Sequence, residues 1–88
     1  MSDDLMIPTV NMNGTSKDEL VRELREAFDA VCTAIDKHAD CTVHGRDFYV
    51  QGPDAINAAL FQRRARSQKL WDVRNELQNI IIALQRSA

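Results

Sequence analysis

Apolar residues between positions 16 and 38 recur at intervals of three and four, which is the spacing of one face of an α-helix. The stripe consists of Leu20, Leu24, Ala27, Val31, Ala34 and His38, widened at intervals of seven by Val21, Phe28 and Ile35. Charged residues occupy most of the remaining positions. Ser16 is followed three residues later by Glu19, which is typical of a helix N-cap with a capping box. The pattern predicts an amphipathic helix over residues 16–38.

A second helix is predicted over residues 53–86. Gly52-Pro53-Asp54 provides a proline at a first-turn position, and neither glycine nor proline follows it. Residues 62–69 are polar and basic on every side and divide the apolar pattern into two parts. The apolar positions of this second helix are Ile56, Ala59, Leu60, Leu70, Trp71, Val73, Leu77, Ile80, Ile81 and Leu84.

The remaining segments are predicted to be an arm and a loop. Residues 1–15 contain Pro8 and the turn dipeptide Asn13-Gly14, which indicate an extended N-terminal arm; a short edge strand is an open alternative. Residues 39–52 form a loop longer than a helix–helix connection requires. It contains Phe48 and Tyr49, and long loops with aromatic and charged residues are where binding residues tend to lie.

These elements predict an all-α chain folded as an antiparallel two-helix hairpin with an extended N-terminal arm. At about 1.5 Å per residue, the helices would be roughly 35 and 50 Å long. The mismatch should leave the apolar residues 77–84 uncovered, which predicts assembly into a homo-oligomeric helical bundle. The expected oligomer interface consists of Trp71, Leu77, Ile80, Ile81 and Leu84.

Length and composition limit the class of protein. With 88 residues, the chain forms a single domain with a small core. It has no signal-peptide pattern and no run of about 20 apolar residues, so we expect a cytoplasmic protein without a membrane span. In a reducing cytoplasm its two cysteines, Cys32 and Cys41, should both be free thiols.

Charge is unevenly distributed along the chain. Residues 1–44 carry nine acidic and four basic residues, residues 45–88 carry four acidic and seven basic ones, and the net charge is −2. Arg63, Arg66 and Lys69, spaced three apart, form a predicted basic strip. We expect the strip to pair with the acidic face of the first helix; anion binding is the alternative. The negative net charge argues against a nucleic-acid partner.

Two segments are candidate ligand-binding sites. Asn13, Gly14 and Thr15 precede a helix whose first amides favour an anion such as phosphate, although an ordinary turn and cap explains them too. In the loop, the Arg46 guanidinium could bind a phosphate, and the ring of Phe48 or Tyr49 could stack on a base. His44 adjoins them. The structural alternative is that Phe48 closes the end of the hairpin.

Metal binding and catalysis are not predicted. His38, Cys41 and His44 are spaced three apart, which fits no standard zinc site, so no metal or cofactor is expected. The sequence contains no glycine-rich phosphate loop with a lysine and no nucleophile with an oriented base. We therefore expect a protein that is not an enzyme.

Three sequence blocks carry a resemblance to known proteins. They are Asn13-Gly14-Thr15, then His44 to Tyr49 (HGRDFY), then Gln51 to Ala55 (QGPDA) leading into the arginine-containing second helix. The chain resembles a group of small uncharacterised helical-hairpin proteins of tailed bacteriophages and prophages. The resemblance implies an accessory protein that acts in the cytoplasm of the bacterial host, and it brings no established activity.

Two functions follow as hypotheses. In the first, the protein is a phage sponge that sequesters a nucleotide-like immune signalling molecule and so counters anti-phage defence; its pocket would combine Asn13–Thr15 of one copy with the loop of another. In the second, it is a protein–protein adaptor or inhibitor that docks a host or phage protein and has no small-molecule ligand.

Overall fold

A computed structural model describes residues 4–11 and 13–86. The described chain contains two long helices, α1 (Lys17–Ala39) and α2 (Ala55–Arg86). Between them lie two single turns of 3₁₀-helix, η1 (Gly45–Asp47) and η2 (Tyr49–Gln51). No strand occurs in the part of the chain that is described, so the all-α prediction is confirmed and the alternative of an edge strand is not realised there.

The start of α1 is capped as the sequence indicates. The Ser16 Oγ accepts a hydrogen bond from the Glu19 backbone N–H at 3.2 Å. The Ser16 hydroxyl in turn donates to the Glu19 Oε1 at 3.1 Å. The cap satisfies one of the amides that a helix leaves without an internal partner at its N-terminus.

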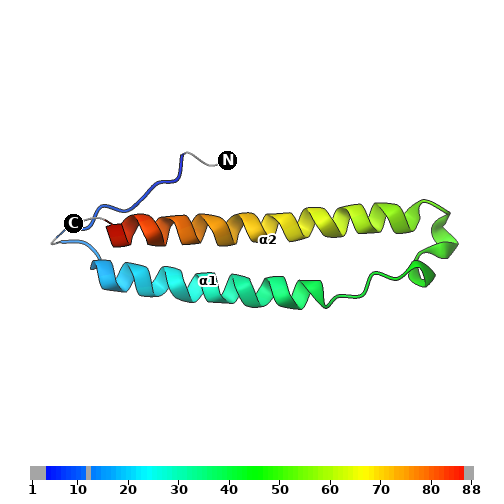
Figure 1. Ribbon diagram of the computed structural model, residues 1–88, viewed down its shortest axis with the longest axis horizontal. Helices are drawn as coiled ribbons and strands as arrows, with labels where there is room; N and C mark the ends of the chain where they lie inside the picture. The colour runs from blue at the N-terminus through cyan, green and yellow to red at the C-terminus, as the bar shows by residue number, and fades with distance from the viewer. Residues whose placement is uncertain (1–3, 12, 87–88) are drawn as a thin grey trace.

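The two helices lie side by side and run in opposite directions (Figure 1). The molecule is a rod of 61 × 23 × 18 Å. Its radius of gyration is 18.5 Å, whereas a compact domain of this length has one of about 12 Å. The chain is therefore far more extended than an ordinary domain.

Buried residues are confined to one end of the rod. Among the described residues, only Ile81 and Leu84 are buried, with 6% and 0% of their surface exposed. At this end, α2 has the start of α1 on one side and the N-terminal arm on the other (Figure 1). We call it the closed end: the arm, the first turns of α1 and the last turns of α2.

The prediction that the apolar residues of 77–84 are uncovered is therefore wrong for Ile81 and Leu84, whereas Ile82 is exposed. The antiparallel pairing places the end of α2 beside the start of α1, and the N-terminal arm runs past the same end (Figure 1). The extra length of α2 is taken up at the opposite end, where the extended loop and the two 3₁₀ turns lie (Figure 1). Ile81 and Leu84 thus belong to the chain's own core.

Polar residues interrupt the face of α2 that packs on α1. Its buried and half-buried positions recur at helical intervals; they include Ala59, Arg63, Ser67, Leu70, Arg74, Leu77, Ile81 and Leu84. The Arg63 Nη2 donates to the main-chain carbonyl oxygen of Ala39, the last residue of α1, at 2.6 Å. The Arg74 guanidinium lies over the rings of Phe28 and Trp71, at 4.9 and 5.1 Å from their centroids.

Candidate functional site

The loop between the helices is folded into two tight turns. The His44 Nδ1 accepts a hydrogen bond from the Arg46 backbone N–H at 3.2 Å and so begins η1. Gly52, which follows η2, has a φ of 114°, a backbone conformation that favours glycine over any residue with a side chain. His44 and Gly52 therefore shape the loop. We call residues 40–56 the loop end.

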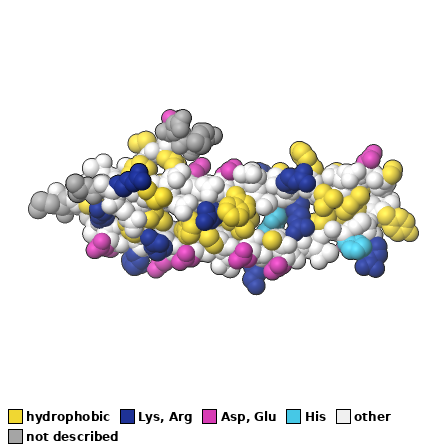
Figure 2. Space-filling view, in the orientation of Figure 1, with side chains coloured by type: hydrophobic (Ala, Val, Ile, Leu, Met, Phe, Trp, Pro, Cys, Tyr) yellow, Lys and Arg dark blue, Asp and Glu magenta, His cyan; other side chains and the backbone are white. Residues whose placement is uncertain are grey.

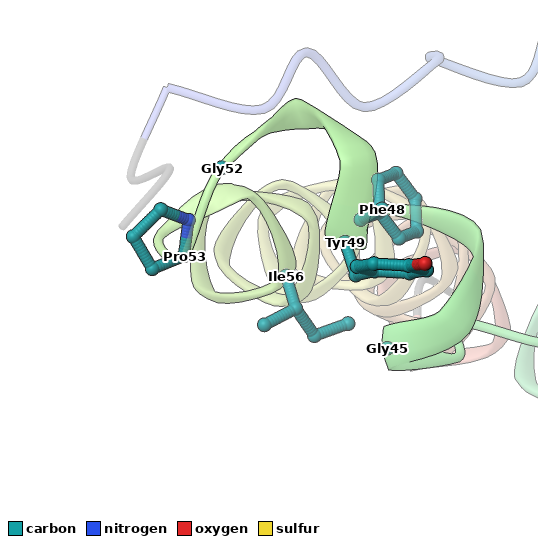
Figure 3. A pocket seen from close by; sticks show the side chains of 6 residues that line it. All are labelled: Gly45, Phe48, Tyr49, Gly52, Pro53 and Ile56. Carbon is teal, nitrogen blue, oxygen red and sulfur yellow. The ribbon is translucent and has the colours of Figure 1, made fainter.

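A notch of about 350 Å³ opens at the loop end. It is lined by Gly45, Phe48, Tyr49, Gly52, Pro53 and Ile56. Figure 3 shows the Phe48 and Tyr49 rings on one side of the notch, Pro53 on the other and Ile56 between them. Phe48 is half-buried, whereas Tyr49 is 77% exposed.

The notch is an apolar surface. No charged side chain lines it; Arg46 is exposed and lies outside the lining. The Tyr49 hydroxyl is the one polar side-chain group of the lining residues. Such a surface suits an apolar side chain or a flat ring better than an isolated phosphate.

The predicted loop residues therefore divide into two groups. Phe48 and Tyr49 line the notch, while His44 and Arg46 do not. The lining residues that the sequence reasoning missed are Gly45, Gly52, Pro53 and Ile56. Two of them could have been found from the sequence. Ile56 follows Pro53 by three residues, so the two residues lie close together at the start of the second helix.

The other predicted segment lies at the closed end. The Asn11 Oδ1 accepts from the Asn13 backbone N–H at 2.9 Å, and the Asn11 carbonyl accepts from the Gly14 backbone N–H at 3.3 Å. Asn13, Gly14 and Thr15 are exposed. Within one copy, this segment and the loop residues are at opposite ends of the rod and cannot form one site (Figure 1).

The predicted pairing of the basic strip with the acidic face of α1 is not observed. The ion pair found in the described structure joins Arg22 to Glu26 at 3.4 Å, both on α1. Arg63 is half-buried at the helix–helix contact, whereas Arg66 and Lys69 are exposed. The reason is geometric: a step of three residues advances about 300° around a helix, so each residue is displaced by about 60° from the one before.

A second pocket, of about 290 Å³, lies where α1 ends against α2. It is lined by His38, Ala39, Leu60, Arg63, Arg64 and Ser67. From the sequence, Arg63 belongs to the basic strip, Arg64 and Ser67 to the basic segment 62–69, and Leu60 to the apolar positions of the second helix. The sequence did not group these residues as one site. Residues 60, 63, 64 and 67 are spaced three and four apart, so the pocket has the spacing of one helix face.

The cysteines and histidines form no metal site. In the described part of the chain, no three His, Cys, Asp or Glu side chains are grouped so that they could hold a metal ion. Cys32 and Cys41 are both free. Within the same residues, neither helix has an apolar stretch long enough to cross a bilayer.

Large hydrophobic side chains are exposed along the rod (Figure 2). Those of α2 are Leu60, Phe61, Trp71, Val73 and Ile82. Leu60, Trp71 and Ile82 are spaced eleven residues apart, about three turns, so they lie nearly in line on one side of the helix. We call these three residues the apolar stripe.

No family model, curated protein or solved structure matches this chain. The resemblance to small phage proteins therefore remains a prediction.

Proposed function

We propose that this chain is a non-enzymatic binding protein that acts as a homo-oligomer, with the apolar stripe of α2 in the interface between copies and the loop end as the recognition surface. The all-α fold supplies a rigid rod. The function comes from the surfaces that the rod leaves exposed.

The observation that carries this proposal is the amount of exposed surface. The chain exposes 6918 Å², whereas a compact monomer of 10.0 kDa exposes about 5,200 Å². The difference is about twice the 800 Å² that each partner contributes to a standard protein–protein interface. With two buried residues described, a lone copy has a small hydrophobic core and leaves much apolar surface in contact with water. Association supplies the missing burial.

Geometry favours the apolar stripe over the interface expected from the sequence. Ile81 and Leu84 are inside the fold and cannot face another copy. Leu60, Trp71 and Ile82 are 41%, 42% and 39% exposed and extend over most of α2. Their eleven-residue spacing is the period at which neighbouring helices coil around each other with a slight right-handed twist.

The loop end then presents its notch to a partner. An apolar notch beside the highly exposed Tyr49 and Val50 is suited to the apolar side chain of a partner protein, because exposed aromatic residues act as anchors in interfaces. This favours an adaptor or inhibitor that binds a protein of the host or the phage.

A nucleotide sponge is the second candidate. A head-to-tail arrangement of copies would bring Asn13–Thr15 of the closed end to the loop end of a neighbour. Arg46 and Tyr49 are both exposed, and no hydrogen bond or ion pair is described for either side chain, so both are available to a ligand. In this arrangement Arg46 binds the phosphate and Tyr49 stacks on the base.

If the chain is a phage or prophage protein, as the resemblance implies, it would bind its protein or nucleotide partner in the bacterial cytoplasm during infection. Sequestering an immune messenger there, or blocking a host protein, would counter anti-phage defence. The role as an accessory protein of a phage is part of the proposal.

Sedimentation equilibrium tests the association. The wild-type chain should be oligomeric at micromolar concentration, and Ile82→Glu should be a folded monomer because it introduces a charge into the apolar stripe. Val73→Glu is the matched control: it is a similarly exposed β-branched residue on the same helix, nearly opposite the stripe. A wild-type monomer at this concentration contradicts the proposal, and so does an oligomer that dissociates with Val73→Glu but not with Ile82→Glu.

Thermal shift distinguishes the two candidates. A cyclic dinucleotide, ADP-ribose or NAD at a hundred times its dissociation constant should stabilise a sponge by about 2.7 kcal/mol. Arg46→Ala and Tyr49→Ala should abolish that shift and leave the unliganded melting temperature unchanged. If none of these ligands shifts the transition and a stoichiometric host protein co-purifies, the adaptor is favoured.

A further inference from the structure

The second pocket combines basic and polar side chains with an apolar wall. Arg63, Arg64 and His38 supply nitrogen donors, and Ser67 supplies a hydroxyl. Leu60 and Ala39 complete the lining. No carboxylate is among these lining residues. Figure 2 shows Lys or Arg side chains beside a histidine on the face in view.

The end of α1 determines how these donors are used. The last carbonyls of a helix lack internal partners and carry a partial negative charge, which repels an anion unless a cation offsets it. Arg63 donates to one of them, the Ala39 carbonyl, at 2.6 Å, and is thereby fixed in the pocket wall. The guanidinium has five N–H donors, and this bond uses one of them.

Arg64 supplies a charge that the chain does not neutralise. Its side chain is exposed, and no ion pair or hydrogen bond is described for it. His38 and Ser67 are half-buried beside it, one from each helix. The pocket is thus a junction of the two helices, lined by an exposed guanidinium without a carboxylate partner, by the guanidinium of Arg63 and by two further polar side chains.

From this arrangement we infer that the pocket between the end of α1 and the first half of α2 binds a small phosphate-bearing anion of mononucleotide size. The phosphate takes its hydrogen bonds from Arg64, Ser67 and the remaining donors of Arg63. The apolar part of the ligand lies against Leu60. A volume of about 290 Å³ is large enough for one such molecule.

This site shares no lining residue with the notch. It is also distinct from the proposed head-to-tail pocket, because one copy of the chain supplies all of its residues. It also differs from the basic strip expected from the sequence. Arg66 and Lys69 of that strip do not line the pocket, and Arg64, which the strip omits, does.

Nuclear magnetic resonance titration tests the site, with 5′-AMP and inorganic phosphate as probes and adenosine and acetate as controls at constant ionic strength. AMP and phosphate should give saturable shifts of the His38, Ala39 and Ser67 amides, with AMP the tighter ligand. Adenosine and acetate should give none that saturate. Failure of both phosphate compounds to saturate overturns the inference, and so does equal binding of adenosine or acetate.

A pair of arginine variants distinguishes specific binding by the lining residues from non-specific attraction to the positive charge of α2. Arg64→Ala should weaken AMP binding about tenfold or more, because it removes a charged donor to the phosphate. Arg66→Ala, an equally exposed arginine two residues away that is not in the lining, should change the affinity by less than about twofold, the effect of long-range charge screened by salt. Equal weakening by both variants overturns the inference.

The titration is run on Ile82→Glu, the monomeric variant, because Leu60 belongs to both the pocket and the apolar stripe. Binding by the monomer supports the pocket whatever the oligomeric state. Association that fails while AMP still binds contradicts the proposed homo-oligomer alone, and association without AMP binding contradicts the pocket alone.

Discussion

The closed end and the loop end of the rod differ in what they bury and what they expose. The closed end contains Ile81 and Leu84, the buried residues of the described chain, together with the Ser16 cap. The loop end contains Tyr49 and Val50, which are 77% and 82% exposed. One end of the molecule holds the helices together, and the other presents side chains to solvent.

Under the proposed function, this difference separates stability from recognition along the chain. Local opening is easiest where few apolar contacts are buried, and binding surfaces are commonly drawn from such regions. Substitutions at the loop end should therefore alter binding with little effect on folding. Substitutions at the closed end should have the opposite effect.

The largest expected effect is that of Leu84→Ala. Truncating a fully buried leucine removes hydrophobic burial and leaves a cavity, which destabilises a protein by about 2–5 kcal/mol. Chemical denaturation monitored by circular dichroism measures the change in the free energy of unfolding. A loss below about 0.5 kcal/mol, the size usual for surface positions, would show that the closed end is not the core.

A smaller effect is expected for Arg63→Ala, which lies between the two ends. The variant loses a charged hydrogen bond to the end of α1, a contribution of about 1.5–3 kcal/mol. Hydrogen exchange should show faster exchange in the last turn of α1 while the closed end stays protected. Arg66→Ala is the control, and an equal loss in both variants would mean that the Ala39 bond is not the cause.

The smallest effect is expected for Val50→Ser at the loop end. Its side chain is 82% exposed, so the free energy of unfolding should change by less than about 0.5 kcal/mol. Thermal melting of the dilute monomer measures it. A loss comparable to that of Leu84→Ala would remove the distinction between the two ends.

Several features of the fold were accessible from the sequence. The three–four spacing of Leu20, Leu24 and Val31 is a local property of the sequence. It predicts a helix whatever tertiary contacts the chain makes. The Ser16 cap depends on residues three apart and needs no tertiary contact. The loop residues Phe48 and Tyr49 of the notch were also identified, because aromatic residues in a long loop are conspicuous.

Other features required the packed helices. Helix lengths suggested that residues 77–84 would be uncovered, yet Ile81 and Leu84 are buried where the end of α2 lies beside the start of α1. The pattern within each helix does not specify the position of one helix relative to the other along their common axis. The same holds for Arg63, whose partner is a main-chain carbonyl 24 residues away rather than an acidic side chain.

The sequence by itself thus determined the helices, their caps and the position of the loop, because these depend on residues within a few positions of each other. The tertiary structure decided which end of the rod is buried, which arginines face the other helix and which residues surround each pocket. Those outcomes depend on the relative placement of two helices, and that placement is set by contacts between residues far apart in the chain.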